Sequence, residues 1–202
     1  MYQISLITGD GIGPELSESV IKVLEIVNDR LDLKLKVEKL EAGDSALAKT
    51  GKALPESTLE AIKRSSACLK APVGESAADV IVVLRRMLNL YANIRPAKSY
   101  PNMPALKDNI DLVIVRENTE DLYTGMEFEV GNSAVALRTI SEHASKRIAK
   151  YAFLTANQRN QKKKVTCVHK SNVMRMTDGL FVRACTEVAK EFPNIKFEQM
   201  YV

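Results

Sequence analysis

Three arginines and a tyrosine between positions 85 and 123 are the side chains of this 202-residue chain best suited to chemistry. Arg85 lies in an apolar run with helical spacing, Arg95 precedes a proline and is therefore extended, and Arg116 follows a β-branched run. A guanidinium stays charged at any working pH and binds a carboxylate through two parallel hydrogen bonds. We therefore expect the arginines to converge on a small polycarboxylate anion, beside Tyr123 as a proton donor. Taken singly, each arginine is more often a solvated or salt-bridged surface residue.

The stretches around these side chains, and three others, resemble one enzyme family. LRRMLNLYANIRPAKS and VRENTEDLYTG contain the arginines and the tyrosine, and further matches are GDGIGPE at 9–15, LKAPVGE at 69–75 and CVHKSNVMRMTDG at 167–179. Together they resemble the β-decarboxylating dehydrogenases, which act on isopropylmalate, isocitrate or homoisocitrate. The resemblance implies a two-domain α/β enzyme that oxidises a 2-hydroxy acid with a nicotinamide cofactor and a divalent metal, then releases carbon dioxide.

The resemblance also assigns roles to positions that match the family's motifs. Tyr123 would protonate the enolate that decarboxylation leaves, and Lys170 would move the proton of the substrate hydroxyl, as a lysine can where burial or positive charge favours its neutral form. In the family this lysine acts in the site of the other subunit, which implies a homodimer or larger homo-oligomer. Asn172 would line the substrate. The cofactor would contact a glycine turn and a loop, at Ile12, Ala71, Pro72, Val73 and Gly74.

The metal ligands are expected outside these residues. In the family they are aspartates, and the first follows a segment like FEQMYV, where this sequence ends at Val202. Asp10, Glu117 and Asp121 lack metal-ligand spacing, and the two histidines, His143 and His169, are single. We therefore expect NAD and Mg²⁺ or Mn²⁺ as cofactors, no metal ligand within this chain, and a chain that represents the N-terminal part of a longer enzyme. The residues that would distinguish NAD from NADP are also expected beyond Val202.

The residues before Arg85 bear on the substrate. Val82, Ile81 and Ala78 precede it by three, four and seven positions and share its face in an α-helix. All are apolar, whereas a third substrate carboxylate would need polar partners. An isopropyl group fits better, with about 0.8 kcal/mol gained per buried methylene, which favours isopropylmalate oxidation in leucine biosynthesis. Isocitrate or homoisocitrate stays an alternative, because MRMTDGLF at 174–181 is as similar to isocitrate dehydrogenase subunits, and a non-catalytic subunit of the same fold is another.

Composition excludes several other classes of protein. The net charge of +4 is modest and no basic patch with interleaved aromatic residues occurs, so a nucleic-acid partner is not expected. The three cysteines, Cys68, Cys167 and Cys185, form no CxxC pair, which argues against a zinc site or a disulfide framework. No leader peptide or membrane-spanning run is evident, so we expect a cytoplasmic protein with no membrane partner.

Strands alternate with helices along the chain, which predicts a largely parallel sheet flanked by helices. The opening strand, glycine turn and helix do not fit a Rossmann fingerprint, because Pro14 stands where the third glycine is required. We predict a first domain at 1–96 and a second at 97–202, with the crossing in the proline-containing stretch 96–104. The second domain should carry an arm hairpin at about 125–140, which the family places at its dimer interface.

The predicted elements follow from apolar periodicity, proline and glycine. Strands are expected at 3–8, 33–40, 67–71, 111–115, 164–168 and 195–200, and helices from Pro14, at 55–64, around Arg85, at 142–160 and at 177–192, with a loop at 42–52. Ser141 is expected to cap the helix at 142–160, and Gly131 and Asn132 to form the turn of the arm hairpin.

Overall fold

The structure is a computed structural model that describes residues 2–202. It contains two compact units, one ending at Asn89 and one running from Leu90 to Val202. The sequence placed the division after residue 96. The difference arises because residues 92–98 form a strand that pairs along its whole length with 111–117, which ties the proline-containing stretch to the second unit. No helix among the described residues combines the length and apolar character needed to cross a membrane.

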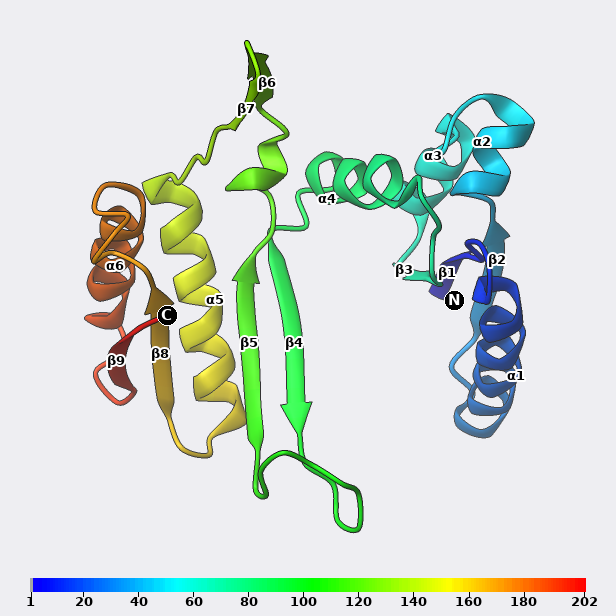
Figure 1. Cartoon of the computed structure of the whole chain (residues 1–202). Helices are drawn as coiled ribbons and strands as arrows, with labels where there is room; N and C mark the ends of the chain where they lie inside the picture. The colour runs from blue at the N-terminus through cyan, green and yellow to red at the C-terminus, as the bar shows by residue number, and fades with distance from the viewer. Residues whose placement is uncertain (1) are drawn as a thin grey trace. The chain divides into compact units, whose positions relative to one another are not determined.

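A three-stranded parallel sheet in the order β2-β1-β3 organises the first unit (Figure 1). Strand β1 (Tyr2–Ile7) lies between β2 (Leu35–Leu40) and β3 (Ala67–Lys70). Helix α1 (Gly13–Leu31) connects β1 to β2 and has a proline in its first turn, where a missing N–H costs nothing. Helix α3 (Glu56–Arg64) precedes β3. Apart from residues 44–50, these elements confirm the predicted order of strands and helices in the first seventy residues.

Residues 44–50, predicted as loop, form helix α2 (Asp44–Thr50). Gly43 precedes it with φ 110°, and Gly51 ends it in the left-handed conformation with φ 75°. A seven-residue helix is too short to show a periodic apolar face, and the loop prediction was therefore wrong. Only Ala46 within it is buried.

The segment that carries Arg85 opens with a π-helical turn, η1 (Ala78–Val82), and continues as α4 (Val83–Met87). Val80 and Leu84 are buried in the core of the first unit, and Ile81 packs against that core. The core is completed by residues from the sheet, from α3 and from the connections between them, namely Ile7, Ala42, Ala53, Leu59 and Ile62. The helical prediction for this segment is confirmed, but a π turn shifts its phase, because each turn contains an extra residue.

The second unit is arranged around helix α5 (Glu142–Arg159). One neighbour is the antiparallel ladder of β4 (Ala92–Lys98) and β5 (Asp111–Glu117), and another is the parallel pair of β8 (Lys164–His169) and β9 (Lys196–Tyr201) (Figure 1). Helix α6 (Thr177–Ala189) packs on α5 and β8. Phe153 of α5 is fully buried and stacks on Phe192 with ring centroids 5.2 Å apart. The parallel pairing here and in the first unit agrees with the predicted α/β class.

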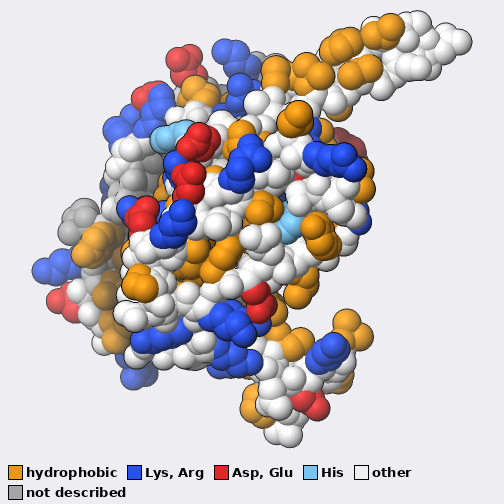
Figure 2. All heavy atoms as spheres, turned by 90° about the vertical axis from the view of Figure 1, so that its left-hand side faces the viewer, with side chains coloured by type: hydrophobic (Ala, Val, Ile, Leu, Met, Phe, Trp, Pro, Cys, Tyr) orange, Lys and Arg blue, Asp and Glu red, His pale blue; other side chains and the backbone are white. Residues whose placement is uncertain are grey.

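A two-stranded hairpin extends from the second unit. Strands β6 (Glu127–Val130) and β7 (Ser133–Ala136) are joined by Gly131 and Asn132, as the sequence predicted. Figure 2 shows it projecting from the unit with hydrophobic side chains along it. Among these, Phe128 is 50% exposed and Val130 is 58% exposed.

Candidate functional site

Two of the three predicted substrate arginines lie on one face of the β4–β5 ladder. Arg116 pairs with Asn93, and Arg95 pairs with Ile114. Residues directly opposite each other share a face, as do residues two apart, so both arginines point to the same side. They occupy diagonal positions, a separation of about 7–8 Å that long side chains can span. The Nε–H of Arg95 donates to Asn93 Oδ1 at 3.1 Å, which orients its guanidinium along this face.

Tyr123 lies beside Arg116 in the same unit. The guanidinium carbon of Arg116 is 5.0 Å from the centroid of the Tyr123 ring, within the range of a cation–π contact. The tyrosine sits on a single 3₁₀ turn, η2 (Leu122–Thr124), between Asp121 with φ 64° and Gly125 with φ 66°. The backbone N–H of Asp121 donates to Thr139 O at 2.9 Å, which anchors this turn to the strand end of the arm. The structure therefore brings Arg95, Arg116 and Tyr123 onto neighbouring positions of one unit.

Arg138, which the sequence analysis did not single out, joins the segments that carry Tyr123 and Lys170. Its Nε donates to Asp121 Oδ1 at 2.7 Å, and its Nη1 forms an ion pair with Asp178 Oδ1. The second oxygen of Asp178 accepts the backbone N–H of Lys170 at 2.6 Å. The side chain of Asp178 is only 8% exposed, so its charge needs this partner.

The pKa values of the linked groups reflect these contacts. Hydrogen bonding to Asp121 and Asp178 raises the pKa of the Arg138 guanidinium, against partial desolvation. Desolvation opposes ionisation of Asp178, but the Lys170 N–H and the Arg138 guanidinium outweigh it and lower the pKa of that carboxyl. Arg138 and Asp178 therefore both carry their charges at neutral pH.

Lys170 begins the turn that follows β8. Its ammonium donates to the backbone carbonyl of Val202, and its backbone carbonyl accepts from the N–H groups of Val173 and Met174. Asn172 in this turn is exposed. His169 is buried, and its Nδ1 accepts the Ser171 N–H at 3.2 Å, which agrees with a structural role for this histidine.

In the first unit, the glycine turn contacts the predicted cofactor loop. The Asp10 N–H donates to Pro72 O at 2.8 Å, and Gly9 approaches so closely that an added Cβ would lie 1.9 Å from that oxygen. Ile12 is 57% exposed at the tip of the turn. Gly11 has φ 56° and no atom within 4 Å of an added Cβ, so open backbone surface lies beside Ile12.

The four predicted cofactor residues of the loop differ in their exposure to solvent. Ala71 is buried and continues the sheet, since its N–H donates to Ile7 O at 2.9 Å. Val73 packs against the core, whereas Pro72 and Gly74 are exposed. Exposed backbone beside the start of a long helix suits the close approach of a dinucleotide, so the turn and loop fit that group. Pro72 and Gly74 are the loop positions available to it.

Arg85 is half-buried on the segment that follows this loop, and Val82 is half-buried with it. Ile81 packs against the core of the first unit, so it contributes less to an apolar wall beside Arg85 than the α-helical spacing predicted. The convergence of Arg85 with Arg95 and Arg116 involves residues of both units and stays a prediction.

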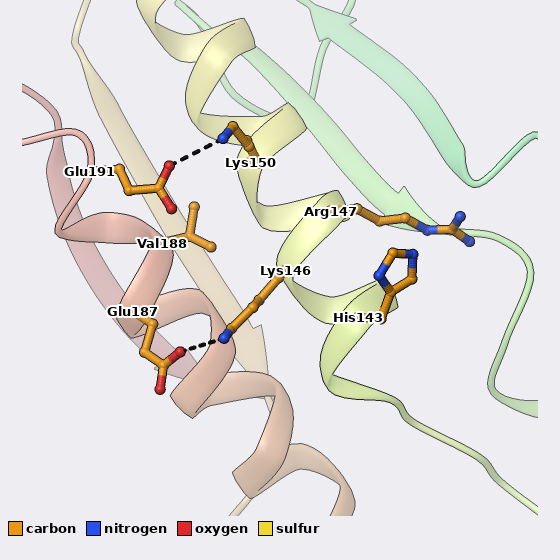
Figure 3. Close-up of a pocket in the computed structure, with 7 residues that line it drawn as sticks. All are labelled: His143, Lys146, Arg147, Lys150, Glu187, Val188 and Glu191. Atoms are coloured by element: carbon orange, nitrogen blue, oxygen red, sulfur yellow. Dashed lines mark hydrogen bonds and ion pairs between the residues drawn. The ribbon is translucent and has the colours of Figure 1, made fainter.

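A groove on α5 and α6 collects charged side chains but carries no chemistry of its own (Figure 3). Lys146 is paired with Glu187 at 2.7 Å, and Lys150 is paired with Glu191 at 3.2 Å. Both lysines are therefore paired within the groove, and Arg147 is paired with Glu117 at 3.5 Å, which does not favour an anion site. The residues that line it are His143, Lys146, Arg147, Lys150, Glu187, Val188 and Glu191.

No group of three or more His, Cys, Asp or Glu side chains between residues 2 and 202 is arranged to hold a metal ion. The carboxylates considered above have other partners. Glu117 accepts the N–H groups of Thr119 and Glu120, both at 2.8 Å, and Asp121 binds Arg138. The side chains of residues 2–202 therefore do not fit a complete metal site.

Comparison with known proteins gives a consistent result over the whole chain. The family model described as isocitrate/isopropylmalate dehydrogenase matches residues 3–202. The 3-isopropylmalate dehydrogenase of Saccharolobus solfataricus is 50% identical over 202 residues, which is 100% of this chain and 59% of that protein. The 3-isopropylmalate dehydrogenase of Archaeoglobus fulgidus is 50% identical over 202 residues, and the chain covers 60% of it.

A solved structure is similar over the whole chain as well. The crystal structure of isocitrate dehydrogenase from Methylococcus capsulatus superimposes with a TM-score of 0.89 at 38% identity, covering 100% of this chain and 60% of that one. The chain thus spans about 60% of the length of the curated relatives that it matches. The α/β fold of isocitrate/isopropylmalate dehydrogenase type that the sequence predicted is confirmed by these matches.

Proposed function

The chain belongs to the isocitrate/isopropylmalate dehydrogenase family, and on this premise we propose that the protein is a 3-isopropylmalate dehydrogenase. It would convert (2R,3S)-3-isopropylmalate to 4-methyl-2-oxopentanoate and carbon dioxide with NAD, a step of leucine biosynthesis. The observation that carries the proposal is the placement of Arg95 and Arg116 on one face of β4–β5 with the Tyr123 ring against Arg116. Two cations beside a phenol suit a dicarboxylate that must be protonated after losing carbon dioxide. The 50% identity to archaeal 3-isopropylmalate dehydrogenases supports this substrate.

In the proposed reaction, Arg85, Arg95 and Arg116 bind the two carboxylates of the malate group. Lys170 takes the hydroxyl proton while the hydrogen on the same carbon leaves as hydride. When bound, the nicotinamide supplies the acceptor for that hydride. The carboxylate on C3 then leaves as carbon dioxide, and the electron pair of the broken bond remains as an enolate. Tyr123 donates a proton to C3 and completes the product.

The cofactor and metal assignments have different support. Ile12, Pro72 and Gly74 would contact NAD, while Ala71 and Val73 would anchor the loop to the sheet and core of the first unit. The contact between the turn and the loop supports this. Val82 and Ile81 would border the isopropyl group, and Asn172 would contact the substrate side. Mg²⁺ or Mn²⁺ is proposed as the metal cofactor, and none of residues 2–202 is proposed as its ligand.

The proposal includes a homodimer, or a larger homo-oligomer, and a cytoplasmic location. The exposed apolar residues of the β6–β7 arm support self-association, because a projecting apolar hairpin gains by being covered. The three cysteines are free thiols, the state usual in a reducing compartment.

The test is a side-by-side assay of the complete gene product that contains this chain, purified without any partner protein. The substrates are 3-isopropylmalate, isocitrate and homoisocitrate, each with NAD and with NADP and with Mg²⁺ or Mn²⁺. We expect kcat/KM to be highest for 3-isopropylmalate with NAD. A clear preference for isocitrate or homoisocitrate would overturn the substrate. No turnover by the pure protein, with turnover restored by a second subunit, would indicate a non-catalytic subunit instead.

A further inference from the structure

Two aspartates join three segments of the first unit that lie far apart in the sequence. Asp10 belongs to the glycine turn, Asp44 begins α2, and both contact the loop at 72–76 that is the proposed NAD loop. The set of Asp10, Asp44 and the groups that bind their carboxylates is called the aspartate clasp below. Every contact in it is within one unit.

The Asp10 carboxylate accepts four hydrogen bonds. They come from the N–H groups of Asp44 at 2.9 Å, Ser45 at 3.0 Å and Gly74 at 3.1 Å, and from the Ser45 hydroxyl at 2.9 Å. Asp10 thus binds the start of α2 with one set of contacts and the proposed NAD loop with another. Hydrogen bonds to an ionised acceptor are about twice as strong as neutral ones.

The Asp44 carboxylate continues the chain of contacts into the same loop. It accepts the N–H groups of Glu75 at 3.0 Å and Ser76 at 2.8 Å, and the Ser76 hydroxyl at 2.6 Å. Ser76 is buried, so its contacts fix the loop where it enters the helical segment that carries Arg85. Consecutive N–H groups at 74, 75 and 76 therefore all point to the two carboxylates.

Two glycines are explained by this arrangement. A Cβ at Gly74 would lie 1.9 Å from Asp44 Oδ2, and a Cβ at Gly43 would lie 2.1 Å from Asp10 Oδ2. Gly74 has no left-handed backbone angle. The space that a Cβ at Gly74 would need is occupied by the Asp44 carboxylate, so a larger residue here would have to displace that carboxylate.

We propose that Asp10 and Asp44 are positioning residues that hold the 72–76 loop in the conformation that binds a nicotinamide dinucleotide. The ligand in this statement rests on the proposed function, whereas the clasp itself rests on the contacts above. A role in stability alone is the competing explanation. It predicts loss of thermal stability without a specific loss of NAD affinity at temperatures where the protein stays folded.

The experiment compares Asp44→Ala, Asp44→Asn and Gly74→Ala in the complete gene product, with Asp29→Ala as the matched control. Asp29 is an exposed aspartate on α1 of the same unit. The readouts are NAD affinity by calorimetric titration, well below the unfolding temperature of each variant, and amide exchange at Gly74, Glu75 and Ser76. Amide exchange needs neither cofactor nor activity.

We expect Asp44→Ala to weaken NAD binding by about tenfold or more and to speed exchange at the three loop amides. Asp44→Asn, which keeps one carbonyl acceptor, should fall between Asp44→Ala and the parent protein. Gly74→Ala should resemble Asp44→Ala because its Cβ displaces the carboxylate. Asp29→Ala should stay within about twofold in affinity.

Distinct results overturn distinct statements. If the three variants bind NAD within about twofold of the parent protein, the positioning role is wrong, whatever their unfolding temperatures. If exchange at the loop amides is unchanged in Asp44→Ala, the clasp does not hold the loop. If the parent protein binds neither NAD nor NADP, the proposed function fails together with the ligand assigned here, and the exchange data still decide whether the clasp holds the loop.

Discussion

At the scale of single residues, Tyr123 is placed so that its ring and its hydroxyl serve different purposes. The ring lies against the Arg116 guanidinium, while the phenol oxygen is the proposed acid. Phe at this position keeps the aromatic ring and removes the hydroxyl group that would supply the proton. We therefore expect Tyr123→Phe to lower kcat by about 10²–10⁴-fold with little change in the KM for the hydroxy acid. Steady-state kinetics of the complete gene product measure both.

The matched control for Tyr123→Phe is Tyr151→Phe. Tyr151 lies on α5 and packs edge-on against Tyr91 with centroids 6.4 Å apart, outside the proposed site. Its kcat should stay close to that of the parent protein. Equal losses of kcat in both variants, or a large rise in KM with kcat unchanged in Tyr123→Phe, would argue against a proton-donor role.

Arg138 has no assigned chemistry, but two carboxylates depend on it. Replacing it with Met keeps the apolar stem and leaves the charge of Asp178 inside the unit with one partner fewer. We expect Arg138→Met to lower the free energy of unfolding by about 3 kcal/mol, as when one partner of a buried pair is removed. Urea unfolding measures this quantity. In a double-mutant cycle, adding Asp178→Asn to Arg138→Met should recover part of the lost free energy of unfolding. The control is Arg183→Met, on the exposed side of α6, which should cost about 0.5 kcal/mol or less.

Asp10 keeps its charge unusually far into acid. Desolvation opposes ionisation, but the N–H groups of Ser45, Gly74 and Asp44 and the Ser45 hydroxyl lower its pKa to about 2. Because the folded pKa lies below the unfolded value of about 3.9, the contribution of Asp10 to stability is complete above about pH 4 and is lost as the pH falls through about 2.

The prediction for Asp10 concerns a difference between two curves of unfolding free energy against pH. The stability advantage of the parent protein over Asp10→Asn should be constant above about pH 4 and shrink toward about pH 2. Urea titrations at stepped pH values give both curves, with Asp29→Asn as control. An advantage that stays constant down to the lower pH would contradict the lowered pKa.

At the scale of elements, the Ser141 cap shows a helix start that could be read from the sequence. The Ser141 hydroxyl oxygen accepts the Ala144 N–H at 3.1 Å and also contacts Glu120 at 2.5 Å. Ser141→Ala removes both contacts, and we expect a loss of about 1 kcal/mol in the free energy of unfolding. Thermal or urea unfolding detects it. Thr155→Ala is the control, because the Thr155 hydroxyl donates to Tyr151 O within the same helix and caps nothing. If Thr155→Ala lost as much free energy of unfolding as Ser141→Ala, the capping role of Ser141 would be contradicted.

The elements found from sequence share a strong local signal, and those missed lack one. Gly131–Asn132 between two extended runs predicted the arm, and Pro14 and Ser141 predicted the starts of α1 and α5. Helix α2 was missed because seven residues show no period. The β4–β5 pairing was missed because Pro96 looked like a linker, although an X–Pro bond is compatible with a short two-stranded ladder.

In the candidate site, too, some residues could be predicted from the sequence and others could not. Motif matches identified Arg95, Arg116, Tyr123 and Lys170, but not the residues that hold them. Arg138 and Asp44 act through partners 17 to 40 positions away in the sequence, and no local pattern reveals such distances. The only sequence signal was a pair of glycines, Gly43 before Asp44 and Gly74 two positions before Ser76. The structure shows a carboxylate beside each of them, which the sequence could not reveal.

At the scale of the whole molecule, the arm gives the clearest test of assembly. Phe128 and Val130 are exposed on a projecting hairpin, and the proposed self-association uses this surface. Phe128→Glu places a charge on that surface, which is costly to bury without a partner. We expect the complete gene product to sediment as a dimer or larger species and Phe128→Glu to shift toward monomer. Glu127→Gln, on the same strand, should leave the assembly unchanged; an unaltered Phe128→Glu oligomer would exclude the arm as an interface.

The aspartate clasp also defines what can be exchanged between relatives when chimaeras are built. A graft of the glycine turn alone would replace Asp10 while its contact partners near Gly43 and Gly74 remained from the host. The smallest segment that can be exchanged as a unit is therefore 9–76, because it contains both aspartates and the glycines that lie against their carboxylates.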